Sequence, residues 1–163
     1  NNLDRIFGNI RNRLPRAALR TSVIVGVPGE TEADFLALEA IVEKMQFDHL
    51  GVFTYSDSDD LPSHRLPNPV PPQTARKRMD RLMELQKNIS NDRNQRYQNE
   101  TLQVLVEQQL EDHLFSARTA FQAPEVDGVT FVKTRPEGPG ISVGSFARVK
   151  IIDTLEYDLV AEV

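Results

Sequence analysis

The stretch Leu19-Arg-Thr-Ser-Val-Ile-Val25, followed by Gly26-Val-Pro-Gly29, decides the fold of the first half of the chain. Its β-branched run at 23–25 has no polar alternation, which is typical of a parallel strand covered on both faces. Thr31 and Asp34 then stand at the spacing of a capping box and predict a helix. A second β pattern at 49–55 completes a strand–helix–strand unit, which is right-handed by strong preference. An α/β architecture follows.

Two further features limit this α/β part. An amphipathic helix is predicted over 3–13, ended by Pro15, from a periodic apolar stripe: Leu3, Ile6, Phe7, Ile10 and Leu14. Two parallel strands are too few for an independent sheet of this kind. We therefore expect 1–55 to be the end of a larger α/β domain, either because the chain is a fragment, which we favour, or because a partner supplies the rest.

The second half changes its period from helical to alternating. Residues 56–72 are a Pro/Asp/Ser-rich connector, and a long helix is predicted from 73 to 97, with Pro72 able to open it. Beyond it, 98–163 holds five short β patterns separated by turn signals, which predict a small closed barrel of OB-like size. The expected strands are 101–106, 113–121, 128–132, 146–152 and 157–161. The expected domain divisions are 1–72, 73–97 and 98–163.

Charge and cysteine content limit the partners. Residues 1–97 carry 14 Lys/Arg and 13 Asp/Glu, a net charge of +1, whereas 98–163 carry 5 and 11, a net charge of −6. Nucleic-acid binders usually show a basic footprint, so nucleic acid is an unlikely partner of the barrel. An acidic barrel would attract a basic protein, although a merely solubilising surface is an equal alternative. The absence of cysteine removes disulfides and thiolate metal sites.

The sequence shows no secretion signal and no apolar run near the roughly 20 residues that cross a bilayer, so a cytoplasmic protein without membrane contact is expected. No catalytic set and no metal site is expected either, since His49, His64 and His113 lack ligand spacing. The loop after the first strand lies where α/β folds bind ligands, although its Gly and Pro could simply shape a tight turn. The basic run Arg76-Lys77-Arg78 with Arg81 could touch RNA, but a solvated face is the commoner reading.

Three stretches together resemble one known family, over almost the whole chain. Arg20-Thr-Ser-Val-Ile-Val-Gly-Val-Pro-Gly-Glu-Thr-Glu-Ala-Asp-Phe35 and Phe47-Asp-His-Leu-Gly-Val-Phe-Thr-Tyr-Ser56 resemble late strands of the barrel in radical SAM methylthiotransferases. Arg81-Leu-Met-Glu-Leu-Gln-Lys-Asn-Ile-Ser90 is similar to the helix leading into their TRAM domain. The resemblance implies the C-terminal part of a radical SAM (β/α) barrel followed by a five-stranded TRAM barrel over 98–163.

Within this family, one branch modifies adenosine in tRNA and another adds a methylthio group to the β-carbon of an aspartate in ribosomal protein uS12. The stretch 118–129 together with Gly51-Val-Phe-Thr-Tyr-Ser56 resembles the uS12 branch, and an acidic barrel suits a basic ribosomal protein better than tRNA. The tRNA branch, and a non-catalytic adaptor that only docks a partner, remain alternatives.

The resemblance also implies cofactors. The full-length enzyme would use S-adenosylmethionine, cleaved to a 5′-deoxyadenosyl radical at a 4Fe-4S cluster on a CxxxCxxC loop. A second 4Fe-4S cluster in an N-terminal domain would take part in sulfur insertion. This chain holds none of those cysteines, so we expect it to be inactive alone.

Site residues follow from the same resemblance. Gly26, Pro28 and Glu30 would border the S-adenosylmethionine pocket, and Val52 would lie on the last barrel strand near the adenosyl end. Pro124, Glu125, Val126 and Asp127 would lie on the TRAM surface, where the carboxylates could meet Lys and Arg of uS12. The alternative for this loop is an ordinary turn, because Asp127-Gly128 is common turn chemistry.

Overall fold

The structure is a computed structural model that describes residues 2–163. It divides into two compact units, Asn1–Ile89 and Ser90–Val163. Within the described part, no helix is long and apolar enough to cross a bilayer.

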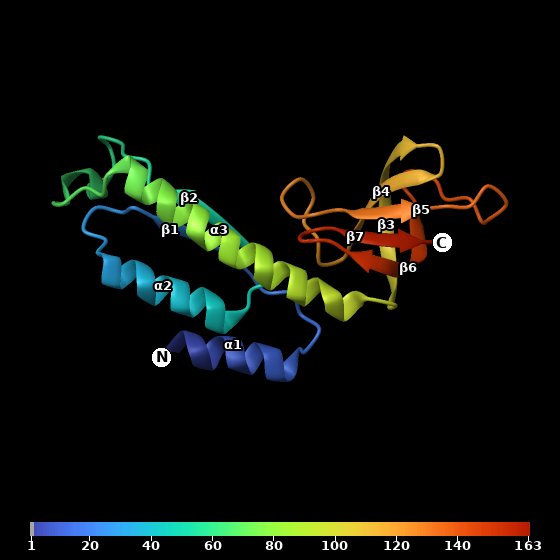
Figure 1. The fold of residues 1–163 in the computed structure, drawn as a ribbon, viewed down its shortest axis with the longest axis horizontal. Helices are drawn as coiled ribbons and strands as arrows, with labels where there is room; N and C mark the ends of the chain where they lie inside the picture. The colour runs from blue at the N-terminus through green and yellow to red at the C-terminus, as the bar shows by residue number, and fades with distance from the viewer. Residues whose placement is uncertain (1) are drawn as a thin grey trace. The chain divides into compact units, whose positions relative to one another are not determined.

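The first unit is a strand–helix–strand module with additional helices (Figure 1). Its elements are α1 (Asn2–Arg13), β1 (Arg20–Val25), α2 (Glu32–Met45), β2 (His49–Thr54), the 3-10 turn η1 (Pro62–Arg65) and α3 (Pro72–Asn94), whose last residues belong to the second unit. β1 and β2 pair in parallel from Arg20↔His49 to Val25↔Thr54. The predicted βαβ unit and the opening of the long helix at Pro72 are therefore confirmed.

Helices cover one face of this two-stranded sheet. Alternate strand residues point into a core formed with α2 and α3, whose buried members are Val25, Phe35, Val42, Leu50, Val52, Leu82 and Ile89. The other face carries Ile24 and Phe53, which are register neighbours and are 56% and 58% exposed. The prediction that the strand is covered on both faces is therefore wrong for the described residues. The apolar composition of β1 instead leaves an open sheet face, as expected at the border of a larger domain.

A smaller core joins α1 to the C-terminal end of α2. Phe7 meets Phe47 edge to face at a centroid distance of 5.2 Å, next to buried Leu19 and Met45. The guanidinium of Arg11 donates to the carbonyl oxygens of Met45 and Gln46 at 2.6 and 2.7 Å. These are carbonyls that the end of a helix leaves without intrahelical donors, so Arg11 caps α2 from outside.

The second unit is a closed barrel. After the end of α3 comes the 3-10 turn η2 (Gln95–Tyr97), where the sequence predicted continued helix. The strands are β3 (Thr101–Glu111), β4 (Leu114–Thr119), β5 (Thr130–Lys133), β6 (Phe146–Thr154) and β7 (Leu159–Glu162). They follow the order β3-β4-β5-β7-β6 and close between β6 and β3, with one parallel pair, β5 with β7. The predicted five-stranded barrel is confirmed. β3 is longer than the expected 101–106, because it continues to pair with β4 up to Glu111 through two register shifts, one after Val106 and one after Gln109.

The barrel interior is apolar apart from a small group of buried polar residues, Thr119, Gln122 and Thr130. Val106, Ala117, Val132 and Ile151 are fully buried in it. The buried Gln122 side-chain oxygen accepts hydrogen bonds from the Thr119 backbone N–H and hydroxyl and from the Thr130 hydroxyl, at 2.8 to 3.1 Å. Because donors of both Thr119 and Thr130 share the Gln122 oxygen, the end of β4 is tied to the start of β5.

Candidate functional site

A pocket lies at the carboxyl ends of β1 and β2, where open α/β folds bind ligands. Its volume is about 470 Å³, within the range of small-molecule sites. The lining comes from the loop after β1, the end of β2, the connector and the first turn of α3: Gly26, Pro28, Thr54, Tyr55, Ser56, Asp57, Pro69, Val70, Pro72, Ala75 and Arg76. The connector closes over the loop, because the Gly29 N–H donates to the Asn68 carbonyl at 2.8 Å.

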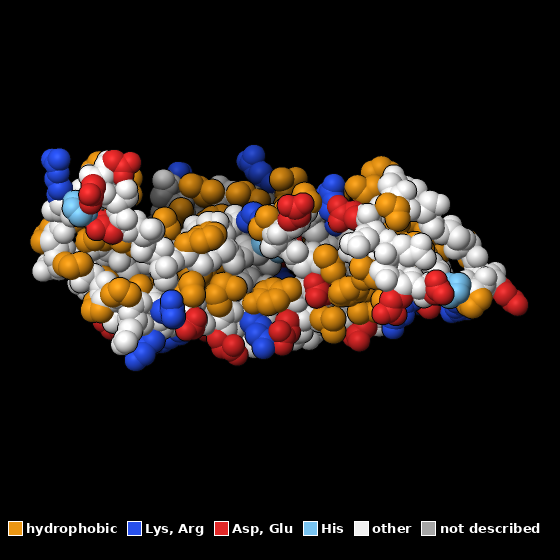
Figure 2. All heavy atoms as spheres, turned by 90° about the horizontal axis from the view of Figure 1, so that it is seen from above, with side chains coloured by type: hydrophobic (Ala, Val, Ile, Leu, Met, Phe, Trp, Pro, Cys, Tyr) orange, Lys and Arg blue, Asp and Glu red, His pale blue; other side chains and the backbone are white. Residues whose placement is uncertain are grey.

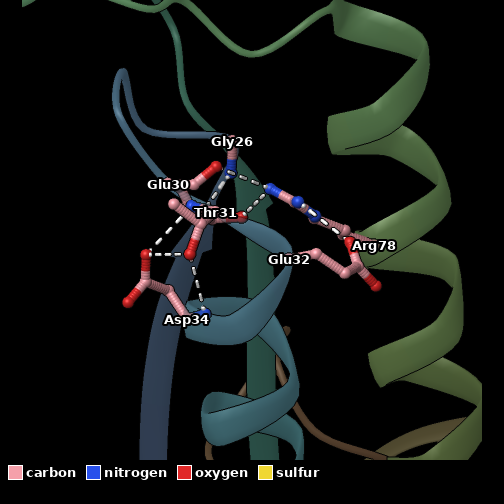
Figure 3. A network of polar contacts seen from close by, with 6 residues as sticks. All are labelled: Gly26, Glu30, Thr31, Glu32, Asp34 and Arg78. Atoms are coloured by element: carbon pink, nitrogen blue, oxygen red, sulfur yellow. Dashed lines mark hydrogen bonds and ion pairs between the residues drawn. The ribbon is translucent and has the colours of Figure 1, made fainter.

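One carboxylate holds the loop at the pocket edge. Figure 3 shows Glu30 turned back toward the end of β1, where its Oε2 accepts the Gly26 backbone N–H at 2.9 Å. Its Oε1 accepts from Nη1 of Arg78 on α3, and Nη2 of Arg78 donates to Glu32 at 3.1 Å. Both Glu30 oxygens are therefore occupied within the unit, and Glu30 does not line the pocket.

The start of α2 is capped as the sequence predicted. The Thr31 hydroxyl accepts the Asp34 N–H, and the Asp34 carboxylate accepts the Thr31 N–H at 2.9 Å (Figure 3). The hydrogen bonds from the Thr31 hydroxyl and then from its N–H lower the pKa of Asp34, against a smaller raising effect of desolvation; the charge of Arg78 adds the smallest lowering effect. The ionised capping box is thus part of the same loop that borders the pocket.

The lowered pKa of Asp34 predicts acid-sensitive stability. A depressed folded pKa contributes stability that is complete above the unfolded value and is lost as pH falls below about 4. We expect the unfolding free energy of the first unit to decline less steeply between about pH 5 and pH 2 in Asp34→Ala than in the unmodified chain. Glu43→Ala near the other end of α2 is the control and should keep the original pH profile. Equal acid profiles for Asp34→Ala and the unmodified chain would contradict the assignment.

The four residues predicted to contact S-adenosylmethionine divide into two groups. Gly26 and Pro28 line the pocket, whereas Glu30 lies outside the lining and accepts the Gly26 backbone N–H. The Val52 side chain is 8% exposed and packs into the helix-covered core. Only its main chain is therefore placed to meet a ligand on the open sheet face, and its predicted role stays a prediction.

A polar group that the sequence did not reveal follows β2. The Tyr55 hydroxyl contacts Asp57 at 3.0 Å and Ser63 at 2.9 Å, and His64 Nδ1 lies 2.9 Å from the other Asp57 oxygen. The contact with His64 is the main cause that lowers the pKa of Asp57, with further lowering by Tyr55. This group links the pocket wall to η1, which supplies both Ser63 and His64.

One residue of the basic run at the start of α3 departs from the predicted solvated face, since Arg76, Lys77 and Arg81 are exposed but Arg78 is buried. The Arg78 side chain is only 8% exposed in its ion pair with Glu30, and Arg81 pairs with Glu39. Arg76 lines the pocket. The solvated-face reading is therefore wrong for Arg78, which is buried between α3 and the loop. No group of three or more His, Cys, Asp or Glu suited to a metal ion occurs among the residues that the structure describes.

The predicted docking residues lie in the loop between β4 and β5. Pro124, Glu125 and Val126 are exposed, with Val126 at 71% and Glu125 in the left-handed region at φ 63°. The Asp127 carboxylate instead accepts the Ala123 N–H at 2.7 Å. The turn reading thus holds for Asp127, whereas Glu125 and Val126 form the accessible tip. On the face of the barrel seen in Figure 2, acidic side chains are widespread and basic ones sparse.

The Glu30–Arg78 contact had no recognisable signal in the sequence. The two residues are 48 positions apart, and Arg78 stands in a run of basic residues. Other members of that run make different contacts: Arg76 lines the pocket and Arg81 pairs with Glu39. The polar group around Asp57 was hidden for a similar reason, since Asp, Ser and His in a Pro-rich connector read as ordinary loop composition.

Comparisons with known proteins agree with both units. A family model for the TRAM domain matches residues 100–163. Ribosomal protein uS12 methylthiotransferase RimO of Clostridioides difficile (strain 630) is 43% identical over 154 residues, which are 94% of this chain and 34% of that protein. The RimO proteins of Fervidobacterium nodosum and Thermotoga maritima are 44% and 45% identical over 98% and 96% of this chain and 36% and 35% of their own lengths.

A small closed barrel preceded by an α/β module with a strand-end pocket, together with the family match, defines a TRAM-domain protein. The similarity extends through the first unit as well, and the matched part is the C-terminal part of the relatives. The chain belongs to the RimO methylthiotransferase family. It spans about a third of the length of the curated relatives it matches.

Proposed function

We propose that this chain is the C-terminal part of a cytoplasmic radical SAM methylthiotransferase that modifies the β-carbon of an aspartate in ribosomal protein uS12. The observation that carries the proposal is identity of 43–45% with RimO proteins across both units. In this proposal the first unit is the last part of the radical SAM barrel, and its open sheet face borders the remainder of that barrel.

The pocket at the ends of β1 and β2 would hold part of S-adenosylmethionine. Its volume suits a ligand portion of this size, and its lining offers main-chain groups at Gly26 together with the Tyr55 ring. When bound, S-adenosylmethionine supplies the hydrogen-abstracting radical and, from a second molecule, the methyl group. The residues of this chain bind and orient it. The iron–sulfur clusters have no ligands here, because the chain contains no cysteine.

The barrel would dock the protein substrate through the tip of the β4–β5 loop. Val126 offers exposed apolar surface, and Glu125 offers a carboxylate that suits the Lys and Arg of a ribosomal protein. The net charge of −6 over 98–163 supports a basic partner, since charge complementarity steers association.

Replacing Glu125 by lysine tests this docking role. In the full-length protein we expect Glu125→Lys to weaken uS12 binding roughly fivefold, most strongly at low salt, because a rim charge acts mainly through association. Cleavage of S-adenosylmethionine without uS12 should continue at the unmodified rate. Asp127 is left unchanged in this experiment, since its carboxylate holds the turn.

Glu111→Lys is the matched control, because it makes the same charge change at the end of β3, next to the start of β4 and away from the β4–β5 loop. Binding of uS12, followed by surface plasmon resonance over a salt series, should be weaker for Glu125→Lys than for Glu111→Lys. Equal weakening in both variants would show that net charge alone matters and would remove the loop tip from the interface.

A tRNA substrate is a second candidate, favoured by one observation. Phe146 is 70% exposed at the start of β6, and Arg148 and Lys150 follow at alternate, exposed positions of the same strand. An aromatic side chain with basic neighbours on a small barrel is a surface on which bases can stack. Tight, salt-sensitive tRNA retention in filter binding, lost in Phe146→Ala and without any affinity for uS12, would decide for this candidate.

A further inference from the structure

We propose that Arg78 is a positioning residue for the pocket: it holds Glu30, and through Glu30 it sets the place of the Gly26 backbone at the pocket edge. The ligand assignment in this inference rests on the proposed function, whereas the ordering of the loop does not.

The contact sequence runs from α3 to the pocket in two steps. Nη1 of Arg78 donates to Oε1 of Glu30, and Oε2 of the same carboxylate accepts the Gly26 N–H at 2.9 Å. Nη1 also lies 3.4 Å from the Glu30 carbonyl oxygen, so the guanidinium reaches both the side chain and the backbone of the loop. Gly26 lines the pocket, but neither Glu30 nor Arg78 does. The Arg78 side chain therefore reaches the pocket edge through the loop (Figure 3).

Burial makes this arrangement rigid. The Arg78 and Glu30 side chains are 8% and 12% exposed, and the guanidinium carbon lies 5.4 Å from the Phe35 ring centroid. A buried ion pair is weak evidence for a gain in stability, because desolvation offsets much of the attraction. Arg78 Nε is also buried without a hydrogen-bond partner among the described residues. A pair that is incompletely satisfied yet buried is better explained by a geometric requirement than by stability.

The geometric requirement lies at Gly26. Its φ of 80° turns the chain sharply at the strand end, and an added Cβ would lie 2.4 Å from Ala75 Cβ. The backbone there is packed against Ala75 of α3, which also lines the pocket, so a shift of Gly26 after loss of the Arg78–Glu30 contact would change the pocket edge. Displacement of a binding surface weakens the affinity for the ligand, which raises KM, and has a smaller effect on the reaction of the bound ligand, which sets kcat.

Arg78→Met in the full-length protein tests the role, with Arg81→Met as the matched control. Arg81 lies one turn further along α3, stacks on the same Phe35 ring at 5.5 Å and pairs with Glu39, but does not reach the loop. For S-adenosylmethionine cleavage without uS12, we expect Arg78→Met to raise KM about tenfold with kcat within about twofold of the unmodified enzyme. Arg81→Met should leave both constants unchanged.

Amide hydrogen exchange provides a readout that does not depend on the ligand. In the ligand-free full-length protein, peptides covering 26–31 should exchange about tenfold faster in Arg78→Met than in Arg81→Met, because the Gly26 N–H loses its fixed acceptor. If the unmodified protein binds no S-adenosylmethionine, the proposed function is overturned, and the exchange of this loop still decides whether Arg78 orders it.

A second substitution distinguishes positioning from general stabilisation. In the double variant Arg78→Met/Glu30→Gln, the side-chain oxygen at position 30 can still accept the Gly26 N–H, and no unpaired charge is buried. We therefore expect its KM to be several fold lower than that of Arg78→Met. Arg78→Lys, which restores the charge at a single point, should recover part of the affinity. The inference would be overturned if Arg78→Met and Arg81→Met changed KM and kcat to the same extent. It would also be overturned if amide exchange of the loop were unchanged in Arg78→Met.

Discussion

Gly26→Ala should destabilise the first unit by about 2–5 kcal/mol, the sum of two separate penalties. The residue adopts φ 80°, where an L side chain costs about 1–2 kcal/mol. The new Cβ would also stand 2.4 Å from the Cβ of Ala75, which is 5% exposed on α3. Overpacking of this kind costs about 1–3 kcal/mol, because neither partner has a rotatable side chain to move away.

Gly29→Ala separates the two penalties. Gly29 has a similar φ of 88°, but its added Cβ would find no atom closer than 4.0 Å. We expect it to cost only the conformational share, about 1–2 kcal/mol. Native-state hydrogen exchange of the β1 and β2 amides measures both variants without interference from the barrel. Equal costs for the two substitutions would contradict the packing argument at Ala75.

Gly128→Ala should destabilise the barrel by about 3–5 kcal/mol or prevent its closure. The added Cβ would stand 2.0 Å from the Tyr157 carbonyl oxygen, so the contact is with backbone and no side-chain rotation relieves it. The loop after β4 and the turn before β7 would have to separate. That separation breaks the Val129 N–H bond to Asp158 at 2.8 Å and the Leu159 N–H bond to Val129 at 2.9 Å.

Gly140→Ala is the matched control in the same unit. Gly140 has no atom within 4 Å of the added Cβ and no left-handed backbone angle, so its replacement should change stability by less than about 0.5 kcal/mol. Calorimetry of the 163-residue chain should show a lowered or absent barrel transition for Gly128→Ala alone. A barrel transition at the original temperature in Gly128→Ala would contradict the close approach at Tyr157.

Local patterns in the sequence predicted the elements of this fold well, because they act over a few residues. The capping pair Thr31 and Asp34 marked the start of α2, and the continuous apolar run of β1 indicated a parallel strand. Alternating patterns after residue 98 predicted five strands, and closure into a barrel followed from their number and length. The alternation could not predict the parallel pairing of β5 with β7, which depends on which edge each strand meets.

The candidate site was predicted less completely, because its contacts join distant segments. The sequence pointed to the strand-end loop, and Gly26 and Pro28 do line a pocket there, whereas their contact with S-adenosylmethionine stays a prediction. The roles of Glu30 and Arg78 were not visible, since a carboxylate in a turn and an arginine in a basic helix are each ordinary by themselves. Similarly, the open face carrying Ile24 and Phe53 could not be told from a buried one, because residue type reports hydrophobicity and not which neighbours are present.

The position of β7 between β5 and β6 has a consequence for synthesis on the ribosome. The β3–β4–β5 meander can form as its residues emerge, because each antiparallel partner follows its neighbour in the chain. β6 can then pair with β3, but the pairings of β7 with β5 and with β6 cannot form until Leu159–Glu162 are free to enter, so β5 and β6 each keep an unpaired edge until then. Translation pauses shortly before that segment should therefore expose an aggregation-prone intermediate, and chaperone contact should concentrate at this stage.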